Sequence, residues 1–212
     1  MKTIKITLIF AGILILASCT KYPPTSSRLL EDLAILTQYD VKTDFGLYKT
    51  FAIVDSATYV TDKDSTRILN TNVKAVLDRI SQDMISRGFT KVAASAEPDL
   101  GINVTVVETT NIIVYYPGWY WGYDGYYPPY WWGYPGYNYY YPYYPVYYTS
   151  YSSGTLIVDM ANFKAKTADN KIPVVWNVFV RALLTGNHTI SDINTGIDQA
   201  FTQSPAIKTF LK

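Results

Sequence analysis

The sequence predicts an α+β domain that is built on a mixed, largely antiparallel sheet of about five strands, with two helices on one face. Two observations lead to this class. Short segments rich in β-branched and aromatic residues recur along the chain, and two longer segments carry apolar residues at helical spacing. Their order is β-β-α-β-β-β-α. A sheet that packs both helices on one face is the economical way to bury the apolar side chains of that order.

Five segments are expected to form the strands, because each has the composition or the alternation of a β-strand. The polar residues 55–66, which follow the second strand, predict a loop. The last two strands are expected to pair around a polar turn at Asp169 and Asn170. The five segments are residues 33–38, 47–54, 99–109 with an extension at 112–114, 154–163 and 172–184.

Two segments have the spacing of amphipathic helices. One of residues 70–72 can cap the start of the first helix, and Gly88 stands where a glycine commonly ends a helix. Asp192 or Asn194 lies near the start of the second helix. The residues expected to face the sheet are Val73, Val76, Leu77, Ile80 and Met84 in the first helix and Ile193, Ile197, Ala200 and Phe201 in the second.

The first 18 residues have the features of a bacterial lipoprotein signal peptide. Two lysines precede an uncharged apolar run, residues 6–16, which is too short to cross a bilayer comfortably. The segment LASC (16–19) then resembles a lipobox and contains the chain's single cysteine. We therefore expect cleavage before Cys19 and attachment of lipid to its thiol, which makes Cys19 the predicted lipidation site.

The expected organisation is a signal peptide (1–18), a tether (19–32) and a single α+β domain (33–212). Thr20, rather than an acidic residue, follows the cysteine, and the usual sorting rule for bacterial lipoproteins then favours the outer membrane. No acidic run follows closely, which favours its periplasmic face. The mature chain has 16 basic and 17 acidic residues, so its net charge of −1 gives no electrostatic footprint for nucleic acid.

Five short segments carry a family resemblance. They are LTQYD (36–40), DFGLYKTFAI (44–53), PDLGINV (98–104), GTLIVDM (154–160) and VVWNVFVRAL (174–183). Together with the terminal amphipathic helix, they resemble the domain of unknown function 4136 (DUF4136) family of bacterial lipoproteins. The resemblance covers about residues 33–212, apart from an aromatic segment. It implies an exported α+β domain without an assigned function, and it supplies no catalytic residues.

Residues 115–151, called the aromatic window below, differ from the rest of the chain. These 37 residues include 17 Tyr, 4 Trp, 6 Pro and 5 Gly, and Asp124 is the one charged residue among them. Proline and glycine at this density oppose a long helix or a regular strand. Because the window falls between two predicted strands, we expect a long hairpin insertion that is not part of the core.

Four interpretations of the aromatic window are open. It can be a partly disordered loop, or a docking surface for another protein or another copy of the chain. It can also stack on the glycan rings of peptidoglycan or lipopolysaccharide, or lie at a lipid headgroup layer. The side chains expected to matter most for binding are Trp119, Trp121, Trp131, Trp132, Tyr126 and Tyr130.

The sequence shows no constellation that is typical of an enzyme. His188 is the only histidine, and it is expected in a surface turn. One histidine and one cysteine supply no conventional zinc or iron site, and neither a nucleophile elbow nor a nucleotide-binding loop occurs. The acids considered, Glu97, Asp99, Asp44 and Asp159, are expected to be solvated charges. We therefore expect no cofactor and no metal.

Two short segments resemble the Asp-(Ser/Thr)-small sites of a bacterial O-glycosylation system. They are DSA (55–57) and DST (64–66), and both fall in the predicted polar loop before the first helix. A transferase could reach such a loop. Ser56 and Ser65 are therefore candidate O-glycosylation sites.

These features together predict a non-enzymatic lipoprotein of the cell envelope with a binding or scaffolding role. The alternative is a module that binds glycan or peptidoglycan through the aromatic window. The expected partners are the membrane, through the lipid anchor, and either an envelope protein or a glycan. No nucleic acid is expected as a partner.

Overall fold

The structure, a computed structural model, describes residues 34–61, 65–108, 112–114, 141–143, 149–151, 154–165, 171–180 and 189–210. The chain divides into two compact units, Met1–Asp32 and Leu33–Lys212, and all the described residues belong to the second. Within that part of the chain, no helix has the length and apolar character to cross a membrane. The elements in chain order are β1 (Ile35–Tyr39), the 3-10 helix η1 (Phe45–Leu47), β2 (Thr50–Ile53), β3 (Ala57–Thr61), β4 (Ser65–Ile68), α3 (Thr71–Ser86), β5 (Thr90–Lys91), the 3-10 helix η2 (Ala94–Ala96), β6 (Leu100–Glu108), β7 (Ile112–Val114), β8 (Tyr141–Tyr143), β9 (Thr149–Tyr151), β10 (Thr155–Asn162), β11 (Lys171–Val180) and α5 (Ile190–Thr202).

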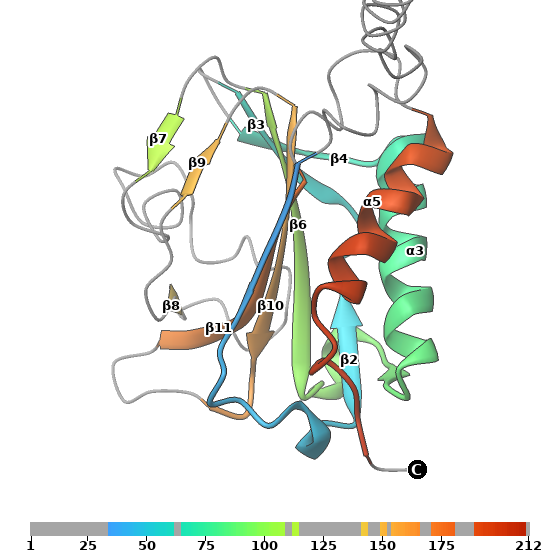
Figure 1. The fold of residues 1–212 in the computed structure, drawn as a ribbon, viewed down its shortest axis with the longest axis vertical. Coiled ribbons are helices and arrows are strands. Elements are labelled where there is room, and N and C mark those ends of the chain that lie inside the picture. Colours follow the sequence, from blue (N-terminus) through green and yellow to red (C-terminus); the bar gives the residue numbers. More distant parts are fainter. Residues whose placement is uncertain are drawn as a thin grey trace, which may run out of the picture. The chain divides into compact units, whose positions relative to one another are not determined.

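A mixed sheet forms the centre of the fold, and its strands β1, β11, β10 and β6 pair with one another, in that order, in antiparallel (Figure 1). Strands β2 and β3 lie one after the other along the other edge of β6 and run parallel to it. Strand β5 pairs with β2, and β4 pairs with β3. The predicted α+β class is confirmed. The sheet has nine strands within the described residues, where about five were expected.

Two of the predicted strands, β6 and β10, are buried along almost their whole length. Along β6, every residue from Leu100 to Val107 is buried, and so is every residue of β10. Both strands are therefore covered on both faces. Strand β1 differs from the expectation of a buried strand, because it lies at an edge of the sheet and its side chains are mostly half-buried.

The predicted loop at residues 55–66 is wrong, because this segment contains β3 and the start of β4. Strand β3 pairs in parallel with the end of β6, from Thr105 to Glu108, and in antiparallel with β4. Strand β4 lies at the edge of the sheet and β3 lies beside it, between β4 and β6, and backbone pairing stabilises both strands without a continuous apolar face. Residues 62–64 lie outside the described part of the chain.

Residues 112–114 do not extend the long strand as expected. They form β7, which pairs in antiparallel with β9 in a separate two-stranded sheet. Strand β8, also from the aromatic window, pairs in parallel with the start of β11, so the window adds a short strand to the main sheet. The long strands β6 and β10 still pair directly up to Val107 and Thr155, and the amide of Gly154 donates to the Val107 carbonyl.

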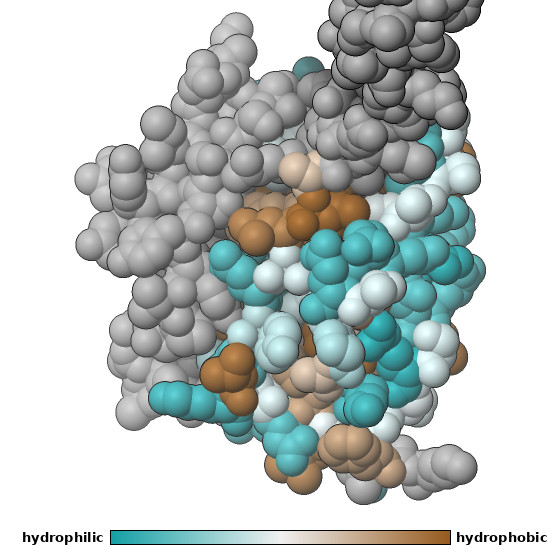
Figure 2. Space-filling model, in the orientation of Figure 1, coloured by the Kyte–Doolittle hydropathy of each residue, from teal (hydrophilic) through white to brown (hydrophobic). Residues whose placement is uncertain are grey.

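Both predicted helices are present, and they lie on the same face of the sheet (Figure 1). The side chain of Asn70 accepts from the amide of Val73 and caps α3, and Gly88 follows the helix with a φ of 95°. Thr189 and Asp192 form a capping box at the start of α5. All nine residues predicted to face the sheet are buried. Figure 2 shows hydrophilic residues over the region of α3 and α5, as expected for the outer sides of amphipathic helices.

Candidate functional site

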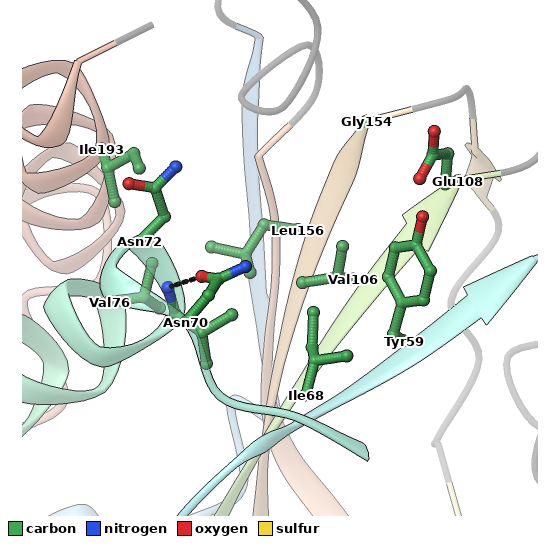
Figure 3. Close-up of a pocket in the computed structure, with 11 residues that line it drawn as sticks. Tyr59, Ile68, Asn70, Asn72, Val76, Val106, Glu108, Gly154, Leu156 and Ile193 are labelled. Atoms are coloured by element: carbon green, nitrogen blue, oxygen red, sulfur yellow. Dashed lines mark hydrogen bonds between the residues drawn. The ribbon is translucent and has the colours of Figure 1, made fainter. Parts of the chain in front are cut away.

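A partly open pocket of about 410 Å³ lies at one end of the sheet, where α3 begins beside β3, β4 and β6 (Figure 3). We call it the α3 pocket. Six elements contribute to it (β3, β4, α3, β6, β10 and α5), together with the turn that leads into α3. The described residues that line it are Tyr59, Ile68, Asn70, Asn72, Val73, Val76, Val106, Glu108, Gly154, Leu156 and Ile193.

The floor of the α3 pocket is apolar and rests on the best-packed elements of the fold. Val106 of β6 and Leu156 of β10 are register partners in the sheet, and both are buried. Val73 and Val76 lie on one face of α3 because they are three residues apart, and the Asn70 cap fixes the start of that helix. A pocket on regular elements has a preformed shape, since neither the sheet nor the capped helix has to reorganise.

Polar groups stand on two opposite sides of the α3 pocket. On the strand side, the Tyr59 hydroxyl and the Glu108 carboxylate point toward one another (Figure 3). The pairing of β3 with β6 places Tyr59 opposite Val106 and brings Glu108 to the same end of the sheet. On the helix side, the Asn70 oxygen accepts from the Val73 amide at 2.9 Å, and the Asn70 amide nitrogen points into the pocket (Figure 3).

This arrangement has the usual features of a small-molecule site, which combines an apolar floor with a few polar groups at defined positions. Its volume lies within the range of about 300–1,000 Å³ that is typical of ligand pockets. Among the described lining residues, Glu108 is the one with a charged side chain. In the described part of the chain, no group of three or more His, Cys, Asp or Glu side chains is placed to hold a metal ion.

A row of polar side chains crosses the opposite face of the sheet. Asn103 of β6 faces Asp159 of β10, Asp159 faces Asn177 of β11, and Asn177 faces Gln38 of β1. Asp159 and Asn103 are fully buried, and Asn177 is 1% exposed. We call these four residues the polar row. The expectation that Asp159 is a solvated charge is therefore wrong.

The polar row faces away from the helices. Trp176, the residue before Asn177, packs on Phe201 of α5 with ring centroids 4.8 Å apart, so Asn177 points to the other face. The Asn177 amide donates to Asp159, and the Asn103 amide donates to the Thr105 hydroxyl at 3.4 Å.

Three carbonyl oxygens of the polar row, on Gln38, Asn103 and Asn177, are buried and have no hydrogen-bond partner among the residues that the structure describes. We interpret the polar row as a structural network.

Asp99, also expected to be solvated, is buried at the opposite end of β6 from the α3 pocket. Its carboxylate accepts from the backbone amides of Lys49 and Thr50 at 2.6 and 3.1 Å, and it pairs with Lys164 at 2.8 Å. Burial alone would raise the pKa of Asp99, but these hydrogen bonds outweigh burial and lower its pKa below the ordinary value. The expectation of solvation holds for Glu97, which is exposed, and for Asp44, which is exposed and also caps η1.

Most of the residues singled out in the sequence lie outside the described residues. This applies to Cys19, to His188 and to all six aromatic side chains, Trp119, Trp121, Trp131, Trp132, Tyr126 and Tyr130. Ser56 and Ser65 do not share a polar loop as expected. Ser56 lies in the bend before β3, donates to Asp55 at 2.8 Å and accepts from Arg67 at 3.1 Å, whereas Ser65 begins β4.

Comparison with known proteins connects this fold to one family. The model of the family described as "domain of unknown function (DUF4136)" matches residues 35–206. The crystal structure of a DUF4136 family protein from Bacteroides thetaiotaomicron is 28% identical, with a TM-score of 0.65 over 84% of this chain and 98% of that chain. No curated protein matches the sequence.

Two further solved structures align with lower scores. A PelC variant dodecamer from Paraburkholderia phytofirmans is 8% identical, with a TM-score of 0.40 over 84% of this chain and 99% of that chain. A PDZ domain protein from Parabacteroides distasonis is 13% identical, with a TM-score of 0.37 over 85% of this chain and 36% of that chain. The family match covers most of the sequence, and on that evidence the chain belongs to the DUF4136 family.

Proposed function

We propose that this chain is a non-enzymatic, lipid-anchored protein of the bacterial cell envelope, whose domain binds a small molecule in the α3 pocket. The observation that carries the binding role is the pocket itself. Its apolar floor is formed by the buried ends of β6, β10 and α3, and polar side chains stand at its rim. A concave apolar surface with a few convergent polar groups is the common form of a ligand site.

The anchoring part of the proposal rests on the first 19 residues. A basic start, an apolar run of 11 residues and small residues before Cys19 are together typical of a lipoprotein precursor. Two or three acyl chains hold a protein stably on a membrane, whereas one chain does so only marginally. The polar residues after Cys19 then act as a tether between the anchor and the domain.

Mass spectrometry of the protein from its native host tests the anchor. Processed protein should begin at Cys19, carry acyl mass on that residue and sediment with the membrane fraction. The Cys19→Ala variant should accumulate as an unprocessed precursor. A water-soluble mature protein with an unmodified Cys19 contradicts the anchoring proposal.

Native mass spectrometry of protein purified from the same host tests the binding role. We expect a co-purified small molecule, which dissociates when the protein is unfolded. In the Ile68→Trp variant, the larger ring should fill the α3 pocket and remove the bound mass. Leu69→Trp is the matched control, because Leu69 is the next residue, is 61% exposed and does not belong to the described lining of the pocket.

Three results separate the outcomes. Loss of the ligand from Ile68→Trp alone supports the α3 pocket as the site. Retention of the ligand by both variants places binding elsewhere and contradicts the proposal. If no small molecule co-purifies, direct titration with amphipathic probes tests the pocket role.

A further inference from the structure

We infer that the α3 pocket selects amphipathic molecules with an amine head group, which lies beside Glu108 while the apolar body covers the valine- and leucine-lined floor. This inference rests on the proposed function, because it assumes that the pocket binds a small molecule. It adds the chemical class of that molecule and the residue that selects it.

The apolar part of the ligand is specified by the floor. Val76, Val106 and Leu156 are each at most 3% exposed, and they come from three different elements that meet at this end of the sheet. Their side chains offer no hydrogen bonds. A hydrocarbon chain or ring is therefore the ligand part that gains most from contact with them.

The head group is specified by charge. Glu108 ends β6 and is exposed at the pocket rim, and among the described lining residues its carboxylate is the one formal charge. The Tyr59 hydroxyl beside it can accept a second hydrogen bond from the same head group. An ammonium group supplies three donors and a positive charge, so it complements both side chains.

The helix side of the α3 pocket, opposite Glu108, favours an anion. Its effect on a charged head group must therefore be compared with the effect of Glu108. The start of a helix carries about half a positive charge, and Asn70 presents an amide nitrogen there. Glu108 carries a full unit of negative charge. The Asn70 oxygen already satisfies the Val73 amide, which is one of the donors that an anion could otherwise bind. The balance therefore favours a cationic head group.

Three probes with the same eight-carbon chain test this inference: octylamine, octanol and octanoate. They are titrated at pH 7 into residues 20–212, which contain the whole compact unit Leu33–Lys212, at concentrations below aggregation. Octylamine should bind about two- to fivefold more tightly than octanol, as expected for one exposed charge pair. Octanoate should bind most weakly. The preference for octylamine should shrink at high salt.

Variants separate the head-group effect from binding itself. Glu108→Gln should remove the preference for octylamine over octanol, whereas Ile68→Trp should weaken all three probes. Equal binding of octylamine and octanol by the wild type, or tightest binding of octanoate, overturns the inference and leaves the pocket role intact. If no probe binds, both the inference and the pocket role are wrong.

Discussion

Substitution of Asp99 by asparagine tests how the fold fixes the end of β6 opposite the α3 pocket. The buried carboxylate accepts two backbone amides, from Lys49 and Thr50, and pairs with Lys164. Asparagine has nearly the same shape and can still accept both amides, but it has no charge. The substitution therefore isolates the contribution of the charge.

The expected cost of Asp99→Asn can be worked from these contacts. Hydrogen bonds to a charged acceptor exceed neutral ones by about 1 kcal/mol each, so two of them lose about 2 kcal/mol. The ion pair adds under about 1 kcal/mol, because the Lys164 side chain is 58% exposed. We expect a loss of about 2–3 kcal/mol in the free energy of unfolding at pH 7.

The pH dependence of this loss follows from the lowered pKa of Asp99. The folded pKa lies below the unfolded one, so the stabilisation is complete above the unfolded value near 3.8 and disappears as the pH falls through the folded pKa. Urea denaturation of wild type and variant between pH 7 and pH 3 measures this. Lys164→Met is the control and should cost less than about 1 kcal/mol. A cost of Asp99→Asn under about 0.5 kcal/mol at pH 7, or a difference that does not shrink below pH 4, refutes the reasoning.

Three further changes test other parts of the fold. Leu77→Ala should lower the free energy of unfolding by about 2–5 kcal/mol because Leu77 is buried. Ile85→Ala, on the exposed side of α3, is the control and should change it by under about 0.5 kcal/mol. Equal effects of the two substitutions would contradict the packing of α3. Burial raises the pKa of Asp83, and the neighbouring Asp198 raises it further. Ionisation of Asp83 therefore lowers the free energy of unfolding as the pH rises through the folded pKa. Asp83→Asn should therefore unfold at a higher urea concentration than wild type at pH 7, with no gain below pH 4, and a loss of stability at pH 7 would contradict this. Replacing residues 115–151 by Asn-Gly should leave a cooperatively unfolding domain, because β6 and β10 pair directly without the window; loss of cooperative unfolding in calorimetry would show that the window is structural.

The sequence predicts the elements whose own residues determine their structure. The start of α3 is correctly placed because Asn70 caps it, and its end because Gly88 has a positive φ. Strand β6 is correctly placed because apolar residues alternate along it, at Leu100, Ile102, Val104 and Val106, and all four are buried. Local pattern and tertiary packing agree in these segments, and that agreement makes them predictable.

Other parts of the fold depend on distant partners. Strands β3 and β4 are polar and form because β3 pairs with the end of β6. Asp159 was expected to be solvated because a charged residue in a strand usually faces water, but it is buried between Asn103 and Asn177. In these cases, pairing with a distant strand determines the local structure and the burial. The composition of a single segment does not show which strand it will pair with.

The α3 pocket could not be predicted for the same reason. Its lining comes from residues as far apart as Tyr59 and Ile193, and one side of it is formed by a strand that was expected to be a loop. Leu156 and Val106 were predicted as strand residues, but only the antiparallel register of β10 and β6 brings them together. The functional signals visible in the sequence are Cys19 and the aromatic window. Cys19 and most of the window, apart from residues 141–143 and 149–151, lie outside the described residues.

The most direct test of the central claim is a chemical-shift titration of isotopically labelled residues 20–212 with octylamine. The account predicts saturable shifts that cluster in the end of β6, the start of β10 and the first two turns of α3, together with smaller shifts at Tyr59 and Ile68. It also predicts that these shifts are absent in Ile68→Trp and present in Leu69→Trp. Shifts that spread over the surface without saturation, or that survive in Ile68→Trp, would contradict a ligand site in the α3 pocket.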